Sequence, residues 1–267
     1  MSLPPKTLAS AWRALTAAGA FFAGLAPVAA HAQIDRADEP IIGQRHSRES
    51  PQNFAVEVRF SPFTPDVDSD PALGGGTPFA TVFGTGPHLL VSAELDWQAY
   101  RIPHLGTVGP GVGAGYTTMS GPAEFSSPHN GSTVSGEDTS LQIFPFYGVA
   151  VLRADVLWRE MGVPLVPYLK AGIGYALWRA SNTLGTSSYG GVEGKGHTFG
   201  TQFALGLGVN LNFFDPYAAK NFDNTMGVNN TYVFAEWTRA DLTGLGFQRD
   251  PLRVGGTSWT FGLAFEF

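Results

Sequence analysis

The sequence predicts an all-β protein, an eight-stranded antiparallel up-and-down transmembrane β-barrel. Three observations lead to this fold class: alternating segments that recur along the chain, few charged residues, and a strongly apolar strand at the C-terminus. Charged residues make up 14% of the 267 residues, against ~25% in typical soluble domains. Phenylalanine, with 20 residues, is abundant, and so is glycine, with 34. A body whose outer surface contacts hydrocarbon has this composition.

The C-terminal segment, Thr257–Phe267, alternates most clearly. Side chains point to opposite faces of a strand in turn, so every second residue shares a face. One face of this segment carries only small or polar residues and Glu266. The other is wholly apolar and consists of Trp259, Phe261, Leu263, Phe265 and Phe267. A strand between lipid and a packed polar lumen has this pattern.

The N-terminal residues 1–32 have the features of a secretory signal peptide. Lys6 and Arg13 precede an apolar run, and the segment closes on the small-x-small sequence of residues 30–32. Residues 33–52 are polar and have no apolar period, which predicts a flexible N-terminal leader. Residues 53–267 then form the predicted outer-membrane barrel.

Eight segments of the barrel region alternate with a period of two and are separated by turn residues. An even number of strands is typical of bacterial single-chain barrels. The predicted strands are Asn53–Ser61, His88–Arg101, Thr107–Thr118, Thr139–Trp158, Val166–Ala180, His197–Phe214, Asn230–Thr243 and Val254–Phe267. The fourth segment is apolar on both faces, so a helix over part of it is the alternative.

The links between these strands alternate in length. Placing both barrel ends in the periplasm puts the long links 62–87, 119–138, 181–196 and 244–253 outside. Short turns, 102–106 and 159–164, lie on the periplasmic side. One periplasmic link, 215–229, is long and is predicted to hold a short helix beginning near Pro216 against the rim.

Aromatic residues near the strand ends predict two girdles at the membrane interfaces. The periplasmic set is Trp97, Tyr100, Trp158, Phe213, Phe214 and Tyr217, and the outer set is Tyr116, Tyr175, Trp178 and Trp237.

Strand phase separates lipid-facing from lumen-facing residues. A shift of one residue would place charges in hydrocarbon, at a cost of ~2–4 kcal/mol for a midplane Lys or Arg. The charged side chains that this phase directs into the lumen are Glu57, Arg59, Glu94, Asp96, Arg153, Asp155, Lys170, Glu236 and Glu266.

An eight-stranded barrel is just wide enough for its side chains to fill it. Buried charges must be paired, so the sequence predicts a salt-bridged network that plugs the lumen. Asp155 and Lys170 lie nearly opposite on neighbouring predicted strands and form one expected pair. The excess of acids over bases leaves a narrow cation or small-solute channel as the alternative.

Other chemistry finds little support in the sequence. No cysteines are present, which excludes disulfides and Cys–metal sites, and the net charge of −6 argues against nucleic acid. Residues 66–70 copy half of a calcium loop, but Pro71 replaces the turn glycine and Thr77 the closing Glu. We therefore predict no metal and no cofactor.

Catalytic residues are not predicted either. His88, His129 and His197 map to the outer side, but no serine or acid recurs beside them in a known arrangement, and a general base needs a partner within hydrogen-bond reach. The expected protein is not an enzyme. A lipid-modifying enzyme at the outer rim is the remaining alternative.

The chain resembles the small outer-membrane barrel proteins of the OmpA/OmpX/OmpW-like group over about Asn53–Phe267. Gly262, Phe265 and Phe267 are similar to the C-terminal assembly signal of Gram-negative barrels, a glycine followed by two spaced aromatics. The resemblance implies an outer-membrane location, contact with outer-membrane lipid and insertion by the barrel-assembly machinery. It also implies a structural or surface-interaction role through the outer loops, with an extracellular ligand that the sequence does not identify.

Overall fold

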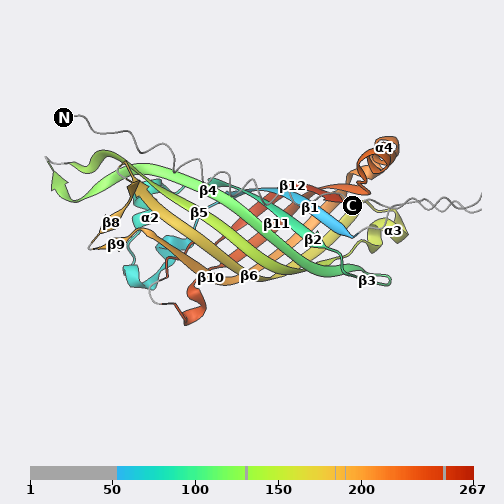
Figure 1. The fold of residues 1–267 in the computed structure, drawn as a ribbon, viewed down its shortest axis with the longest axis horizontal. Coiled ribbons are helices and arrows are strands. Elements are labelled where there is room, and N and C mark those ends of the chain that lie inside the picture. The colour runs from blue at the N-terminus through green and yellow to red at the C-terminus, as the bar shows by residue number, and fades with distance from the viewer. Residues whose placement is uncertain (1–52, 130–131, 184, 190, 249–250) are drawn as a thin grey trace, which may run out of the picture. The chain divides into compact units, whose positions relative to one another are not determined.

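Eight long antiparallel strands close into a barrel in the computed structural model (Figure 1). The structure describes residues 53–129, 132–183, 185–189, 191–248 and 251–267, so the predicted signal peptide and leader lie outside the described residues. The strands are β1 (Phe54–Phe63), β2 (His88–Trp97), β4 (Gly106–His129), β5 (Ser132–Arg153), β6 (Leu165–Asn182), β10 (Lys195–Asn210), β11 (Asn230–Asp241) and β12 (Gly256–Glu266).

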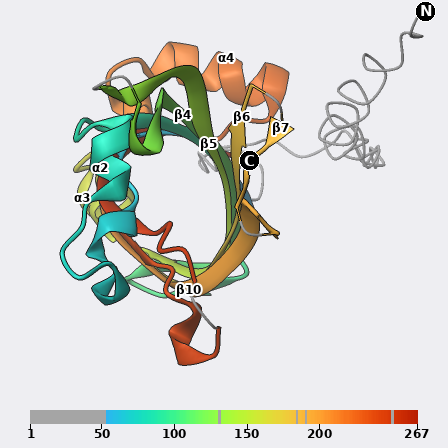
Figure 2. The same cartoon turned by 90° about the vertical axis from the view of Figure 1, so that its left-hand side faces the viewer.

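The ring closes where the first strand meets the last. Each strand pairs with its neighbour in chain order, and β1 also pairs with β12, with Val58 opposite Leu263. The view along the barrel axis in Figure 2 shows the closed wall. Closure pairs both edge strands of the eight-stranded wall with each other. The strand pairing confirms the predicted eight-stranded antiparallel barrel.

Short elements lie at the two ends of the barrel. The terminal end, where β1 begins and β12 ends, carries β3 (Tyr100–Ile102), α3 (Val156–Met161) and α4 (Pro216–Met226). The opposite end, here called the loop end, carries α2 (Pro78–Phe83), β7 (Gly185–Thr186), β8 (Ser188–Tyr189) and β9 (Val192–Glu193). Within the described ranges, no helix is both long enough and apolar enough to span a membrane.

Large apolar side chains form an exposed band around the barrel wall. Leu89 of β2 is 61% exposed, Ile173 of β6 69% and Leu205 of β10 56%. Trp259 and Phe261 of β12 are half exposed as well. A soluble monomer rarely leaves so much contiguous apolar surface in water. On the opposite face of β2, Glu94 and Asp96 are buried, and so are Lys170 of β6 and Glu266 of β12.

Inward glycines accommodate aromatic rings from the neighbouring strand. An added Cβ at Gly206 would lie 2.2 Å from Cζ of Tyr168, the residue opposite it on β6. Such glycine–aromatic pairs pin the register of a curved sheet. The same arrangement recurs across two other strand pairs, Gly113 with Tyr147 and Gly262 with Phe234.

Replacing Gly206 by alanine tests this packing. We expect Gly206→Ala to lower the free energy of unfolding by about 1–3 kcal/mol, because the Tyr168 ring must leave its place in a filled lumen. Urea unfolding of the refolded barrel in detergent measures the change. Gly148→Ala is the matched control, because its added Cβ meets no atom within 4 Å. Equal stability of the two variants would contradict the packing role.

Several predicted strand boundaries are wrong. The sixth predicted strand was expected to end at Phe214, but β10 ends at Asn210 and residues 211–213 form a 3₁₀ helix. Residues 119–138 were expected to form a loop, but β4 and β5 continue through them as a paired hairpin, with Met119 opposite Leu141. Residues 120–138 show no regular alternation of apolar and polar residues in the sequence, so periodicity did not predict strands there. The fourth predicted strand ends at Arg153, and residues 156–161 form α3 before Gly162 in the left-handed conformation (φ 68°).

Two further predictions concern the barrel ends. The helix expected near Pro216 is confirmed as α4. Trp178 was placed in the outer aromatic girdle, but this is wrong because Trp178 packs against the apolar cluster inside the loop end. Trp178 shares its phase with Lys170, eight residues earlier, and both therefore face inward.

The loop end is filled by an apolar cluster that the sequence analysis missed. The link after β1 folds over the mouth, and the two carboxylate oxygens of Asp68 accept hydrogen bonds from Phe79 N (2.8 Å) and Ala80 N (2.9 Å) of α2. A Cβ at Gly121 would lie 1.9 Å from Val82 O, so α2 lies directly against β4. The buried members of the cluster are Phe63, Val67, Phe79, Met119, Leu141, Ile143, Ala176, Leu242 and Val254.

Candidate functional site

Eight charged side chains meet inside the barrel, and all are at most 4% exposed. They come from six strands, because each strand turns one face inward. We call this set the charge network. Its members are Glu57 and Arg59 of β1, Glu94 and Asp96 of β2, Arg153 of β5, Lys170 of β6, Glu236 of β11 and Glu266 of β12.

Arg59 occupies the centre of the network. Its Nη1 lies 2.6 Å from Glu57 Oε2 and 2.9 Å from Glu94 Oε2. Its Nη2 donates a hydrogen bond to Glu236 Oε1 of β11, two strands away around the ring. Glu57 and Glu94 are directly opposite each other on β1 and β2, where like charges destabilise pairing. The guanidinium between them offsets that repulsion.

Lys170 reaches the same carboxylates from β6. Its Nζ lies 2.8 Å from Glu57 Oε2, 2.5 Å from Glu94 Oε1 and 3.5 Å from Glu236 Oε2. One ammonium group therefore links acids of three strands. Three donors on a compact cation suit this arrangement.

Arg153 binds the acids nearest the terminal end. Its guanidinium lies 3.1 Å from Glu57 Oε1, 3.2 Å from Asp96 Oδ2 and 3.3 Å from Glu266 Oε1. Glu57 therefore contacts all three cations of the network. The three cations and their carboxylates connect six of the eight strands across the lumen.

Tyrosine rings and hydroxyls enclose the network. Tyr147 donates to Glu94 Oε2 at 2.7 Å, and Tyr232 donates to Glu266 Oε2 at 2.9 Å. The Tyr168 ring centroid lies 5.0 Å from Lys170 Nζ, within cation–π range. The inward phase that identified the charges also contains these three tyrosines, so the pattern could have predicted them.

The acids outnumber the bases in the charge network. Five carboxylates face three cations, so full ionisation leaves two negative charges in excess. Asp96 Oδ1 and Glu236 Oε2 have no hydrogen-bond partner within the described part of the chain. Uncompensated buried charge is costly. The excess is a stability cost that the network carries.

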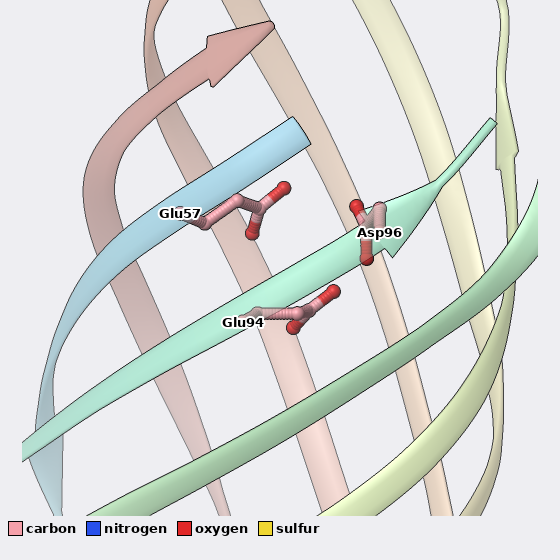
Figure 3. Close-up of side chains that lie close together, drawn as sticks. All are labelled: Glu57, Glu94 and Asp96. Carbon is pink, nitrogen blue, oxygen red and sulfur yellow. The ribbon is translucent and has the colours of Figure 1, made fainter. Parts of the chain in front are cut away.

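Glu57, Glu94 and Asp96 turn their carboxylates toward one another (Figure 3), with one oxygen of each within 4.8 Å of the others. Several carboxylate oxygens close together are the ligands that Ca²⁺ and Mg²⁺ prefer. Here Lys170 Nζ already binds Glu57 and Glu94, and Arg153 binds Glu57 and Asp96. The geometry is that of carboxylates around ammonium and guanidinium groups.

Asp155 lies apart from the charge network, contrary to its predicted pairing with Lys170. The chain leaves the wall after Arg153, and Asp155 stands at the start of α3. Its Oδ2 accepts a hydrogen bond from Arg101 Nη1 at 2.8 Å near the rim. The prediction extended the strand through Trp158, which is why Asp155 and Lys170 seemed to face each other.

Two cavities adjoin the charge network. A cavity of ≈60 Å³ lies between the charge network and the apolar cluster, lined by Arg59, Tyr147, Gln202 and Ile143 among others. A second cavity of ≈10 Å³ adjoins Glu57 and Arg153. The larger one has room for a few water molecules.

Two of the outer histidines contact aromatic rings. The His197 ring stacks on Tyr175 with centroids 5.6 Å apart, and His88 meets Phe79 edge-on at 6.3 Å. The side chain of His129 lies outside the described side chains. At the other end, His104 Nδ1 lies 3.0 Å from Glu160 Oε1 in an exposed pair.

The predicted assembly signal lies along β12, at the closing seam. Gly262 faces inward beneath the Phe234 ring, whereas Phe267 is 38% exposed. A Cβ at Gly262 would also lie 2.1 Å from Val58 O of β1. Packing alone therefore requires glycine at this position. Recognition of the segment by assembly machinery stays a prediction.

No family model matches the chain, and no curated protein matches it. Solved structures of small barrels are similar to it, including Ail, the attachment invasion locus protein of Yersinia pestis (12% identity, TM-score 0.38, covering 81% of this chain and 97% of that chain). Neisserial surface protein A matches with 13% identity, 81% and 95% coverage and a TM-score of 0.35. The N-terminal β-barrel domain of Pseudomonas aeruginosa OprF matches with 13% identity, 81% and 98% coverage and a TM-score of 0.34. The eight-stranded closed barrel itself follows from the strand pairing of this chain.

Proposed function

We propose that the chain is a non-enzymatic integral protein of the outer membrane, with a closed lumen and an interaction surface at its loop end. The proposal rests on the distribution of polarity in the barrel, which is the reverse of that in a soluble protein. Apolar side chains cover the wall, while eight charged side chains are buried inside. Lipid around the barrel accounts for the apolar wall, and a filled polar lumen accounts for the buried charges.

The proposed orientation places the terminal end in the periplasm and the loop end outside the cell. Both ends of the barrel chain meet at the terminal end, where Asn53 N donates to Phe267 O at 2.8 Å. The hairpin of β4 and β5 extends past the other strands at the loop end (Figure 1). This hairpin and α2 offer the surface for an extracellular partner. Outer-membrane lipid and, through β12, the barrel-assembly machinery are the other proposed partners.

A structural role fits the described interior better than transport. The charge network spans the lumen, and the apolar cluster covers it at the loop end. The two described outer histidines, His88 and His197, contact aromatic rings. These contacts support a barrel that connects the membrane to surface partners without catalysing a reaction.

A narrow cation conduit is the second candidate, favoured by the excess of two carboxylates and the ≈60 Å³ cavity beside Arg59. Planar-bilayer recordings of the refolded protein distinguish the two. We expect no conductance steps, because ions cannot cross a network of mutually bound side chains. A sixteen-stranded porin added to the same bilayer supplies the positive control. Stable cation-selective steps would replace the structural proposal with the conduit.

A further inference from the structure

An open groove of about 240 Å³ lies between helix α4 and the barrel wall at the terminal end. The groove is lined by Leu211, Asn212, Asp215, Ala218, Ala219, Phe222 and Thr231. Thr231 lies in the outward phase of β11, because its neighbours Asn230 and Tyr232 are buried in the lumen. The groove therefore opens on the outer side of the wall.

The helix is well formed but uncovered by the barrel. Asp215 Oδ1 accepts hydrogen bonds from Tyr217 N (3.1 Å) and Ala218 N (2.9 Å), which caps the N-terminus. Gly227, with φ 72°, ends the helix in the left-handed conformation. None of its eleven residues is buried, although the chain is buried again at Val228. A short helix with this little burial is marginal in water.

One face of α4 is apolar and turns to the groove. Ala218, Ala219, Phe222 and Met226 recur at helical spacing, and the first three of them line or flank the groove. Lys220 and Asn224 lie on the opposite face. Met226 is 65% exposed and Phe222 37%, so a substantial apolar area has no protein partner among the described residues.

The side chains around α4 indicate what covers its apolar face. Leu205 and Leu207 of β10 are exposed on the outer face of the wall, and Leu211, which lines the groove, follows them in the same phase. Exposed rings lie at the N-terminal end of the helix: Phe213 is 51% exposed, Phe214 69% and Tyr217 85%. Aromatic rings at the end of an apolar band are typical of the membrane–water interface. The apolar groove is thus continuous with the surface proposed to contact lipid.

We propose that α4 lies in the periplasmic leaflet as an interfacial helix and that its groove binds a phospholipid acyl chain. The inference rests on the proposed membrane location of the barrel. An amphipathic helix in the interface buries its apolar face near the acyl boundary and keeps its polar face in water. Phe222 and Met226 then contact lipid, while Asn221 and Asn224 remain hydrated.

Site-directed spin labelling tests this directly, because the chain contains no cysteine of its own. Phe222→Cys and Met226→Cys report the apolar face, and Asn221→Cys and Asn224→Cys are the matched controls on the same helix. Each full-length variant is refolded into vesicles of phosphatidylethanolamine and phosphatidylglycerol. Accessibility of the nitroxide to oxygen, which partitions into lipid, is compared with accessibility to a water-soluble nickel complex.

We expect the oxygen-to-nickel ratio at residues 222 and 226 to be several-fold higher than at residues 221 and 224. Equal ratios, with nickel accessible at all four positions, would overturn the inference. Leu205→Cys, in the middle of the wall, distinguishes a failure of the interfacial helix from a failure of the membrane location on which it rests. A lipid-like ratio at 205 with water-like ratios on α4 rejects only the interfacial helix, whereas a water-like ratio at 205 rejects the membrane location itself.

Discussion

Replacing Arg59 by methionine is expected to lower the free energy of unfolding by about 3–5 kcal/mol, because it removes one partner from a buried charge network. Arg59 binds Glu57, Glu94 and Glu236 at once, and its side chain is almost completely buried. With all five carboxylates ionised, its removal raises the excess of negative charge in the lumen from two to three. Since whole domains are stable by about 5–15 kcal/mol, the loss is a large fraction of the total.

Urea unfolding of the refolded barrel in lipid vesicles measures this effect. Asp96→Asn is the informative contrast, because it removes a carboxylate whose Oδ1 has no hydrogen-bond partner among the described atoms. We expect that variant to be as stable as the parent or more so, since the excess charge falls. Lys195→Met, which breaks an exposed pair with Glu193, should leave stability unchanged. A small loss for Arg59→Met, equal to that for Lys195→Met, would contradict the network's role.

Truncating Phe79 to alanine is expected to release the apolar cover of the loop end, at a cost of about 3–5 kcal/mol. Phe79 is 4% exposed and packs against Phe83 with ring centroids 5.2 Å apart. The cavity left by its ring would adjoin a short helix that the apolar cluster and the Asp68 cap hold in place. The cost should therefore appear as local opening of α2.

Hydrogen exchange of the α2 amides measures this opening. A cost of this size corresponds to exchange that is faster by about a hundred-fold to several thousand-fold. Amides of β1 and β12 at the closing seam should exchange at the parent rate. Phe247→Ala is the matched control, because its ring is 86% exposed on another loop-end link. Unchanged exchange of α2 in Phe79→Ala would mean that the cluster does not hold the helix.

Much of the barrel wall was predictable from local sequence. A period of two separates Glu57 and Arg59 from the apolar residues on either side of them, whatever the neighbouring strand is. The same rule placed Lys170 and Glu236 inside, and the outward apolar band followed. Predicted boundaries were wrong where the sequence does not alternate, as in residues 120–138, which pair as a hairpin although they carry no regular period of two.

The pairing of the charges was not predictable in this way. Lys170 binds Glu57 and Glu94, which precede it by 113 and 76 residues, whereas the expected partner Asp155 is only 15 residues away in the sequence but binds Arg101. Distance across a lumen depends on closure and on the stagger of all eight strands. The sequences of two adjacent strands determine neither the closure of the ring nor the stagger of all eight strands.

The sequence by itself determined which face of most strands meets the lumen, because a Lys or Arg on the lipid side costs ~2–4 kcal/mol near the midplane. Only the tertiary structure decided which acid meets which base, how α2 covers the loop end and where α4 leaves a groove. The charge pairs depend on closing the ring, which brings β12 back to β1 and turns side chains of six strands into one lumen. The cover and the groove depend on how the links pack against the ends of the wall, which the period of two does not determine.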